Sequence, residues 1–107
     1  MQRKDRYEKG HEVCGARSQP LARAAALYRS SAERGDATAA YNLGLAYLNG
    51  DGVGLHKNRA AKWFRVAADM DFPPGLHNRG MCFAYGTGVP KDPDRAVQLI
   101  SRAAALG

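Results

Sequence analysis

Only a few side chains in this sequence carry groups suited to acid–base, nucleophilic or metal chemistry, and they are scattered. His11 and Cys14 lie near the N-terminus, but a tetrahedral metal site needs further ligands and no second His or Cys cluster supplies them. His56 and His77 have no Ser or Cys nucleophile with a matching acid beside them. The sequence therefore predicts no catalytic residues, no bound metal and no cofactor, so we expect a protein that is not an enzyme.

Glycine-rich segments resemble phosphate-binding loops in composition. Gly50-Asp51-Gly52-Val53-Gly54 is one such segment, but the Gly-Lys-Ser/Thr ending of a phosphate-binding loop does not follow it. A similar segment, Gly86-Thr87-Gly88-Val89, returns later in the chain without that ending. Turns in which glycine supplies a positive φ explain both copies.

The chain is basic, with a formal net charge of +6 and a pI near 9.7. Its cations are spread along the whole sequence between acidic residues, which is typical of a solvated basic surface. Arg23, Arg59 and Arg95 recur at one spacing near the start of predicted helices, where a cation opposes the helix dipole. A loop carboxylate or burial of the aliphatic stem must compensate there. Binding of a polyanion such as nucleic acid stays open as an alternative function.

Cys14 and Cys82 lie far apart, and the first ten residues contain no apolar core of a secretory signal. We therefore expect reduced thiols in a cytoplasmic protein. No apolar run approaches the roughly 20 residues that span a bilayer, so we expect no membrane span.

The strongest pattern is a block of about 36 residues that occurs twice in full and once in part, as in helical repeat proteins. The positions that recur are Gly44, Tyr47, Gly50, Gly52, Ala60, Trp63, Phe64 and Ala67 in one block, and Gly80, Phe83, Gly86, Gly88, Ala96, Leu99, Ile100 and Ala103 in the next. Each unit of such an array buries its apolar face against its neighbours. The sequence therefore predicts an all-α solenoid, an α-α superhelix of about two and a half helix-pair repeats.

Helix start and stop signals divide the chain further. Residues 1–17 lack a clear helical period, so we expect a flexible arm or a degraded helix there. For residues 18–107 we expect a repeat domain made of a half repeat (18–35) and two repeats (36–71 and 72–107). The predicted helices begin at Pro20, about Ala37, Asn58, Gly75 and Pro93, with Asp36, Asn58 and Asp92 as N-caps.

Gly44 and Gly80 stand inside predicted helices, where glycine costs up to about 1 kcal/mol relative to alanine. Glycine is expected at these positions despite this cost because it allows the paired helix to approach closely. We expect Trp63 or Phe64 to pack over the first gap. Leu99 and Ile100 would do so over the second.

The motif Leu43-Gly44-x-x-Tyr47-x-x-Gly50-x-Gly52-Val53, followed by Arg59-Ala60-x-x-Trp63-Phe64-x-x-Ala67-Ala68, resembles a Sel1-like repeat, a relative of the tetratricopeptide repeat with a longer loop. The third unit departs from that pattern at Arg79, where leucine is expected, and the second has His56 where aspartate is usual. The resemblance implies a right-handed solenoid whose first helices line a concave groove that binds proteins. Some cysteine-rich relatives are linked to β-lactam hydrolysis, an alternative that implies a cysteine pair within each repeat, and this chain lacks that pair.

The resemblance implies that the concave surface binds a protein or peptide, which makes this chain a non-catalytic scaffold or adaptor. The candidate contact residues are Tyr41, Asn42, Leu45, Asn49, His77, Asn78, Met81 and Tyr85. Asn42 and Asn78 share one repeat position and lead these candidates, because an amide both donates and accepts hydrogen bonds. Solvation, or bonding to a neighbouring helix, is the alternative for both. No polar capping helix follows Ala105-Leu106-Gly107, so we also expect the last apolar face to be covered by another copy, a partner or residues of a longer protein.

Overall fold

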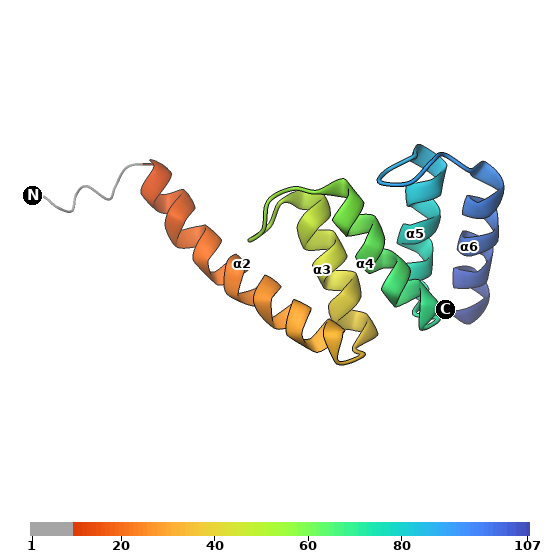
Figure 1. Ribbon diagram of the computed structural model, residues 1–107, viewed down its shortest axis with the longest axis horizontal. Helices are drawn as coiled ribbons and strands as arrows, with labels where there is room; N and C mark the ends of the chain where they lie inside the picture. The colour runs from red at the N-terminus through yellow and green to blue at the C-terminus, as the bar shows by residue number, and fades with distance from the viewer. Residues whose placement is uncertain (1–9) are drawn as a thin grey trace, which may run out of the picture.

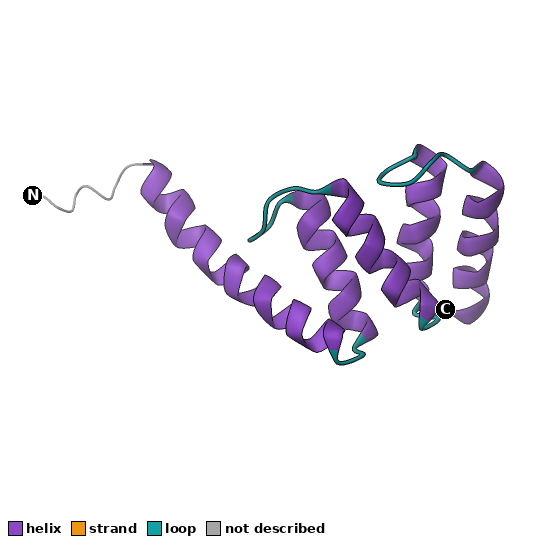
Figure 2. Ribbon diagram, in the orientation of Figure 1, coloured by secondary structure: helices purple, strands orange, loops and turns teal. Residues whose placement is uncertain are grey.

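The computed structural model describes residues 10–107, and within that range every regular element is an α-helix. The helices stand in a row, joined by short turns and longer loops (Figures 1 and 2). They are α2 (Gly10–Glu33), α3 (Ala37–Asn49), α4 (Lys57–Asp69), α5 (Pro73–Tyr85) and α6 (Pro93–Leu106). The predicted all-α architecture is confirmed.

Each helix packs against the next one along the chain, and α3 also touches α5. Among the described helices, the backbone of α2 does not come close to that of α4, and the backbone of α4 does not come close to that of α6. The backbones of the first helices, α3 and α5, are thus closer together than those of the second helices. The array is elongated, with extents of 59 × 28 × 20 Å and a radius of gyration of 16.8 Å, against about 13 Å for a compact domain of roughly this size.

Aspartates cap two of the helices, as the sequence predicts. Asp36 Oδ1 accepts a hydrogen bond from the Ala39 N–H at 3.2 Å, and Asp92 Oδ1 accepts one from the Arg95 N–H at 3.2 Å. Pro93 occupies the first turn of α6, where its missing N–H leaves no hydrogen bond unmade. The first turns of α3 and α6 are therefore fixed by local sequence.

The N-cap of α4 is His56, so the prediction of Asn58 is wrong. The Nδ1 atom of His56 accepts a hydrogen bond from the Arg59 N–H at 3.2 Å, and the helix begins at Lys57. His56 holds the repeat position of Asp92, and an unprotonated imidazole nitrogen can accept the bond that a carboxylate accepts there.

The helix starts predicted at Pro20 and Gly75 are also wrong. Pro20 lies inside α2, where proline removes one backbone donor but keeps a φ that suits a helix. α5 begins at Pro73, because proline suits the first helical position. Residues 1–9 of the predicted arm lie outside the described residues, and the division at residue 17 stays a prediction.

The first glycine of each repeat loop ends the first helix of its pair. Gly50 and Gly86 adopt left-handed conformations with φ of +73° and +70°. The backbone N–H of His56 then donates to the Tyr47 carbonyl at 2.9 Å, which closes the loop onto the helix that it leaves.

The second glycine of each loop packs against the helix that precedes the pair. A Cβ on Gly52 would lie 2.2 Å from the carbonyl oxygen of Leu21, and one on Gly88 would lie 2.5 Å from that of Lys57. Both glycines have positive φ, +79° and +71°. Leu21 and Lys57 occupy one repeat position on α2 and α4, so both loops fold back onto the preceding second helix in the same way.

Small residues bring the two helices of each pair together. A Cβ on Gly44 would lie 2.6 Å from Cε1 of Phe64, and one on Gly80 would lie 2.7 Å from Cγ1 of Ile100. Phe64 therefore covers the first gap, and partly buried Trp63 packs against the edge of the same core. The alanines buried at repeat positions on the second helices are Ala60, Ala67, Ala96 and Ala103.

Candidate functional site

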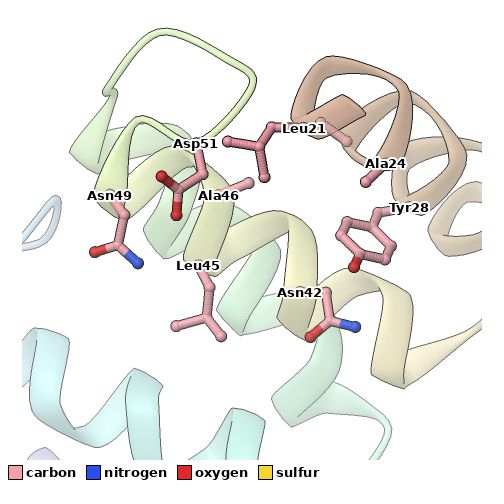
Figure 3. Close-up of a pocket in the computed structure, with 9 residues that line it drawn as sticks. Leu21, Ala24, Tyr28, Asn42, Leu45, Ala46, Asn49 and Asp51 are labelled. Atoms are coloured by element: carbon pink, nitrogen blue, oxygen red, sulfur yellow. The ribbon is translucent and has the colours of Figure 1, made fainter. Parts of the chain in front are cut away.

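A recess of about 240 Å³ opens between α2 and α3. Figure 3 shows Asn49 and Asp51 at one end of it and Tyr28 and Asn42 at the other, with Leu45 between them. It is lined by Leu21, Ala24, Ala25, Tyr28, Asn42, Leu45, Ala46, Asn49 and Asp51.

A second recess, of about 260 Å³, lies between α4 and α5. It is lined by Leu48, Phe64, Asn78, Met81, Cys82, Tyr85 and Thr87. Tyr85 leaves 73% of its surface exposed, the largest share among the large hydrophobic residues described here. An exposed aromatic side chain beside a recess is a common feature of protein-binding surfaces.

The two recesses are one structural feature repeated along the solenoid. Each forms where a first helix packs against the second helix of the preceding pair. The matched lining positions are Asn42 with Asn78, Leu45 with Met81, Ala46 with Cys82, Asn49 with Tyr85 and Asp51 with Thr87. Each recess therefore offers an asparagine amide beside an apolar side chain, and the two stand in register.

Six of the eight predicted contact residues line these recesses, and two do not. The ring of Tyr41 packs against the rings of Phe64 and Phe72, with centroid distances of 6.0 and 5.8 Å. His77 is exposed, and its Nδ1 lies 3.4 Å from Oδ1 of Asn78. Tyr41 thus packs in the interface between successive repeats, and His77 lies next to Asn78 at the second recess.

Sequence reasoning missed the side of each recess that comes from the preceding helix and the loop. Leu21 and Tyr28 of α2 line the first recess, and Thr87 of the loop lines the second. The available signal was the repeat itself, because Tyr28 holds the position of Phe64 in the next unit. Packing of each first helix onto the preceding second helix makes that position a wall of the recess.

The recesses carry amide and apolar groups, and no charged side chain is central to them. Asn42 and Asn78 are half-buried, which limits their contact with water but leaves the amides accessible. Burial raises the pKa of the Cys82 thiol, and the nearby Arg79 charge partly opposes this effect. Cys82 therefore stays a neutral thiol at pH 7.

The arginines near the starts of α4 and α6 are compensated by aromatic rings of the paired helix. The guanidinium carbon of Arg59 lies 5.9 Å from the centroid of the Tyr47 ring, and that of Arg95 lies 5.3 Å from the Phe83 ring. Cation–π attraction and packing of the side-chain stems explain how a cation is accommodated where the helix dipole opposes it. Of the expected means of compensation, a loop carboxylate or burial of the aliphatic stem, the first is not found among the described ion pairs of Arg59 and Arg95, and an aromatic ring lies beside each guanidinium instead.

Among the side chains that the structure describes, no three His, Cys, Asp or Glu residues form a group that would hold a metal ion. The described helices also include none with the length and hydropathy needed to cross a membrane. The glycine loops serve as turns, since Gly50 ends a helix and Gly52 lies against Leu21.

Comparison with known proteins finds a family model, the Sel1 repeat, that matches residues 6–36, 37–72 and 73–107. Two solved structures are similar to this chain. A Sel1 repeat protein from Oxalobacter formigenes is 32% identical with a TM-score of 0.75 over 78% of this chain. A protective antigen of uropathogenic Escherichia coli strains, which displays an SLR fold, is 33% identical with a TM-score of 0.80 over 89%.

The matched regions make up only part of those proteins. They cover 63% of the first and 22% of the second, so the chain spans less than two thirds of either. The comparison with curated protein sequences gives no match.

Proposed function

The chain belongs to the Sel1 repeat family, and from this premise we propose that it is a non-catalytic scaffold that binds a protein or peptide along the first-helix side of the solenoid. Repeat proteins of this kind generally mediate protein interactions. Their stacked units present an extended surface rather than an enclosed cavity.

The observation that carries the proposal is the pair of equivalent recesses. Asn42 and Asn78 stand one repeat apart on α3 and α5, the two first helices that touch one another. A peptide lying across both helices would meet the same amide twice. Each amide can donate to a peptide carbonyl and accept from a peptide N–H.

Apolar side chains beside the amides support the same proposal. Leu45 and Met81 flank the asparagines, and Tyr85 is largely exposed at the rim of the second recess. Methionine adapts its shape to different apolar ligands, and tyrosine contributes a large contact area with little loss of conformational freedom. The surface therefore suits a peptide with apolar anchors and an exposed backbone.

The double variant Asn42→Ala plus Asn78→Ala tests this proposal. Peptides are selected from a displayed library against the unmodified protein, and their affinities are then measured by titration calorimetry. Loss of two neutral hydrogen bonds, each worth about 0.5–1.5 kcal/mol, predicts binding weaker by about five- to 150-fold. Because both asparagines are half-buried, thermal melting must first show that the variant folds.

Ser30→Ala plus Ser101→Ala is the matched control, since both serines are exposed on second helices. We expect it to leave the affinities unchanged. Selected peptides that bind the asparagine double variant as tightly as the unmodified protein would contradict the proposed surface. A library that yields no binder would count against a peptide-binding function.

A further inference from the structure

Arg79 breaks the repeat at a position where the preceding unit buries a leucine. Its counterpart Leu43 is completely enclosed, with 0% exposure, whereas Arg79 is a half-buried cation on α5. Placing a guanidinium there forfeits apolar burial and takes a charge partly out of water. Burial, and next the positive charge of Arg65, lowers the pKa of Arg79 below its ordinary value. Local stability alone would favour leucine.

Further cations gather around this arginine. A recess of about 360 Å³ is lined on its α4 side by Lys62 and Arg65, and on its other sides by Arg79 and Arg95. An adjoining recess of about 370 Å³ shares Arg79 and Arg95 and extends along α6 to Arg102. We call these two recesses together the basic groove; its charged lining residues are Lys62, Arg65, Arg79, Arg95 and Arg102.

Two of these cations have a carboxylate partner. Arg65 lies 3.8 Å from Asp69, in a pair whose side chains are both well exposed and which is therefore weak. Arg102 contacts Asp71 at 2.8 Å. Both acids stand at or just beyond the C-terminal end of α4, so they compensate one end of the basic groove.

The remaining three cations form no ion pair with the side chains described for residues 20–107. These are Lys62, Arg79 and Arg95. The guanidinium carbons of Arg79 and Arg95 both lie against the Phe83 ring, 5.0 and 5.3 Å from its centroid. Because one buried ring holds both groups, their charges stay close together despite mutual repulsion.

The corresponding groove of the preceding repeat differs. That groove is lined by three cations, Arg29, Arg59 and Lys62, and by one acid, Glu33, which is the repeat counterpart of Asp69. Arg29 there donates a hydrogen bond to the hydroxyl of Tyr47. Leu43 holds the repeat position of Arg79 but is fully buried and does not line the earlier groove. The charges added in the third repeat are those of Arg79 and Arg102, whose counterparts are Leu43 and Val66, so the repeat architecture does not require them.

We propose that the basic groove binds an acidic peptide segment of a partner protein, with its carboxylates on Arg79 and Arg95. Arginine pairs with carboxylates through two parallel hydrogen bonds, which gives both strength and orientation. Val89 and Leu99 add apolar surface to the lining, which suits the mixed side chains of a peptide. Asp69 and Asp71 at one end would repel a run of negative charges that continues along the groove, as a phosphate backbone does. A peptide can place carboxylates at Arg79 and Arg95 alone and neutral residues beside the two aspartates, so the groove favours a peptide over a nucleic acid.

The basic groove lies between α4, α5 and α6 and shares no lining residue with the first-helix recesses. Peptide binding in the basic groove does not depend on whether those recesses bind a ligand. The variant Asn42→Ala plus Asn78→Ala leaves the basic groove intact, and variants of the basic groove leave both asparagines in place. Failure of one proposal is therefore distinguishable from failure of the other.

Fluorescence anisotropy with a labelled short peptide, in which two neighbouring glutamates are flanked by apolar residues, tests the proposal. Arg79→Leu restores the residue found at this position in the second repeat, so we expect the variant to fold. Removing one charge-assisted pair predicts affinity weaker by about tenfold. Arg34→Gln removes the same charge at an exposed site at the end of α2 and serves as the control, with a much smaller expected effect.

Three outcomes would overturn the proposal. The first is an equal loss of affinity in Arg79→Leu and Arg34→Gln, which would reduce the effect to net charge. The second is the absence of saturable binding. The third is tighter binding of a single-stranded oligonucleotide of equal charge, which would assign the groove to nucleic acid. Should thermal melting show that Arg79→Leu is unfolded, Arg95→Gln takes its place with the same expected loss, because Arg95 is exposed.

Discussion

Gly44 lacks a side chain at the point where the ring of Phe64 from α4 packs against α3. An alanine Cβ would lie 2.6 Å from Cε1 and 2.7 Å from Cδ1 of Phe64, and that ring is only 1% exposed. An enclosed ring cannot swing away into solvent. Glycine at this position therefore lowers the helix propensity of α3 but allows close packing against Phe64. The sign of the change in stability on substitution by alanine follows from the sizes of these two effects.

We expect Gly44→Ala to destabilise the protein. Alanine would gain up to about 1 kcal/mol of helix propensity, but overpacking against Phe64 costs about 1–3 kcal/mol. Urea denaturation followed by circular dichroism measures the net loss. Gly54→Ala is the matched control, because nothing lies within 4 Å of a Cβ at that position, and it should leave stability unchanged. A higher midpoint for Gly44→Ala would show that the core has room for the methyl group.

The sequence reveals that Arg79 is unusual, but it does not reveal which residues surround Arg79. The repeat makes it visible in the sequence as a departure from Leu43. Its consequence depends on Lys62 and Arg95, which lie in other helices. Sequence spacing does not bring these residues together, because their proximity arises from the stacking of α4, α5 and α6.

The loops are the elements that connect each helix pair to the preceding one. Both loop glycines have positive φ, but they meet different surroundings. A Cβ on Gly86 would have no neighbour closer than 3.5 Å, whereas one on Gly88 would lie 2.5 Å from the Lys57 carbonyl oxygen and 2.9 Å from the Ala61 Cβ. Comparing substitutions at Gly86 and Gly88 therefore separates the effect of backbone conformation on stability from the effect of close packing.

We expect Gly88→Ala to destabilise the protein more than Gly86→Ala. Both variants place alanine in the left-handed region, at a cost of about 1–2 kcal/mol, and Gly88→Ala adds about 1–3 kcal/mol of overlap with α4. Gly52→Ala and Gly50→Ala repeat the comparison in the other loop, where the overlap is with Leu21. Thermal melts of the four variants measure it. Equal losses within each pair would mean that the loops do not rest tightly on the preceding helix.

Helix ends were predictable where a local side chain or a glycine fixes them. Asp36, Gly50 and Asp92 act within a few residues of their own position, and the structure places all three where the sequence indicates. The predicted helix ends were wrong where an uncommon residue type occupies the position. His56 caps α4 although histidine is an uncommon cap, and α2 continues through Pro20. The first-helix walls of the recesses were predictable from the repeat, while their loop and preceding-helix walls required the packed structure.

At the scale of the molecule, contacts run mainly between neighbouring helices. Apart from α3 with α5, the backbones of the described helices lie close only to the next helix in the chain. Stability in such an array is approximately a sum of the units and the interfaces between them. A local change at one interface should therefore weaken the coupling between the two sides more than it weakens either side.

Gly75 tests this behaviour at the junction between the second and third repeats. A Cβ there would lie 2.6 Å from the Cβ of fully buried Ala67 and 3.2 Å from the backbone of Ala68. Gly75→Ala should therefore push α5 away from α4, with a loss of about 1–3 kcal/mol. Hydrogen exchange resolved by helix is the measurement. We expect the amides of α5 and α6 to exchange roughly five- to 150-fold faster, as a loss of about 1–3 kcal/mol implies, while α3 changes less. Equal acceleration in every described helix would instead show that the solenoid opens as a single cooperative unit.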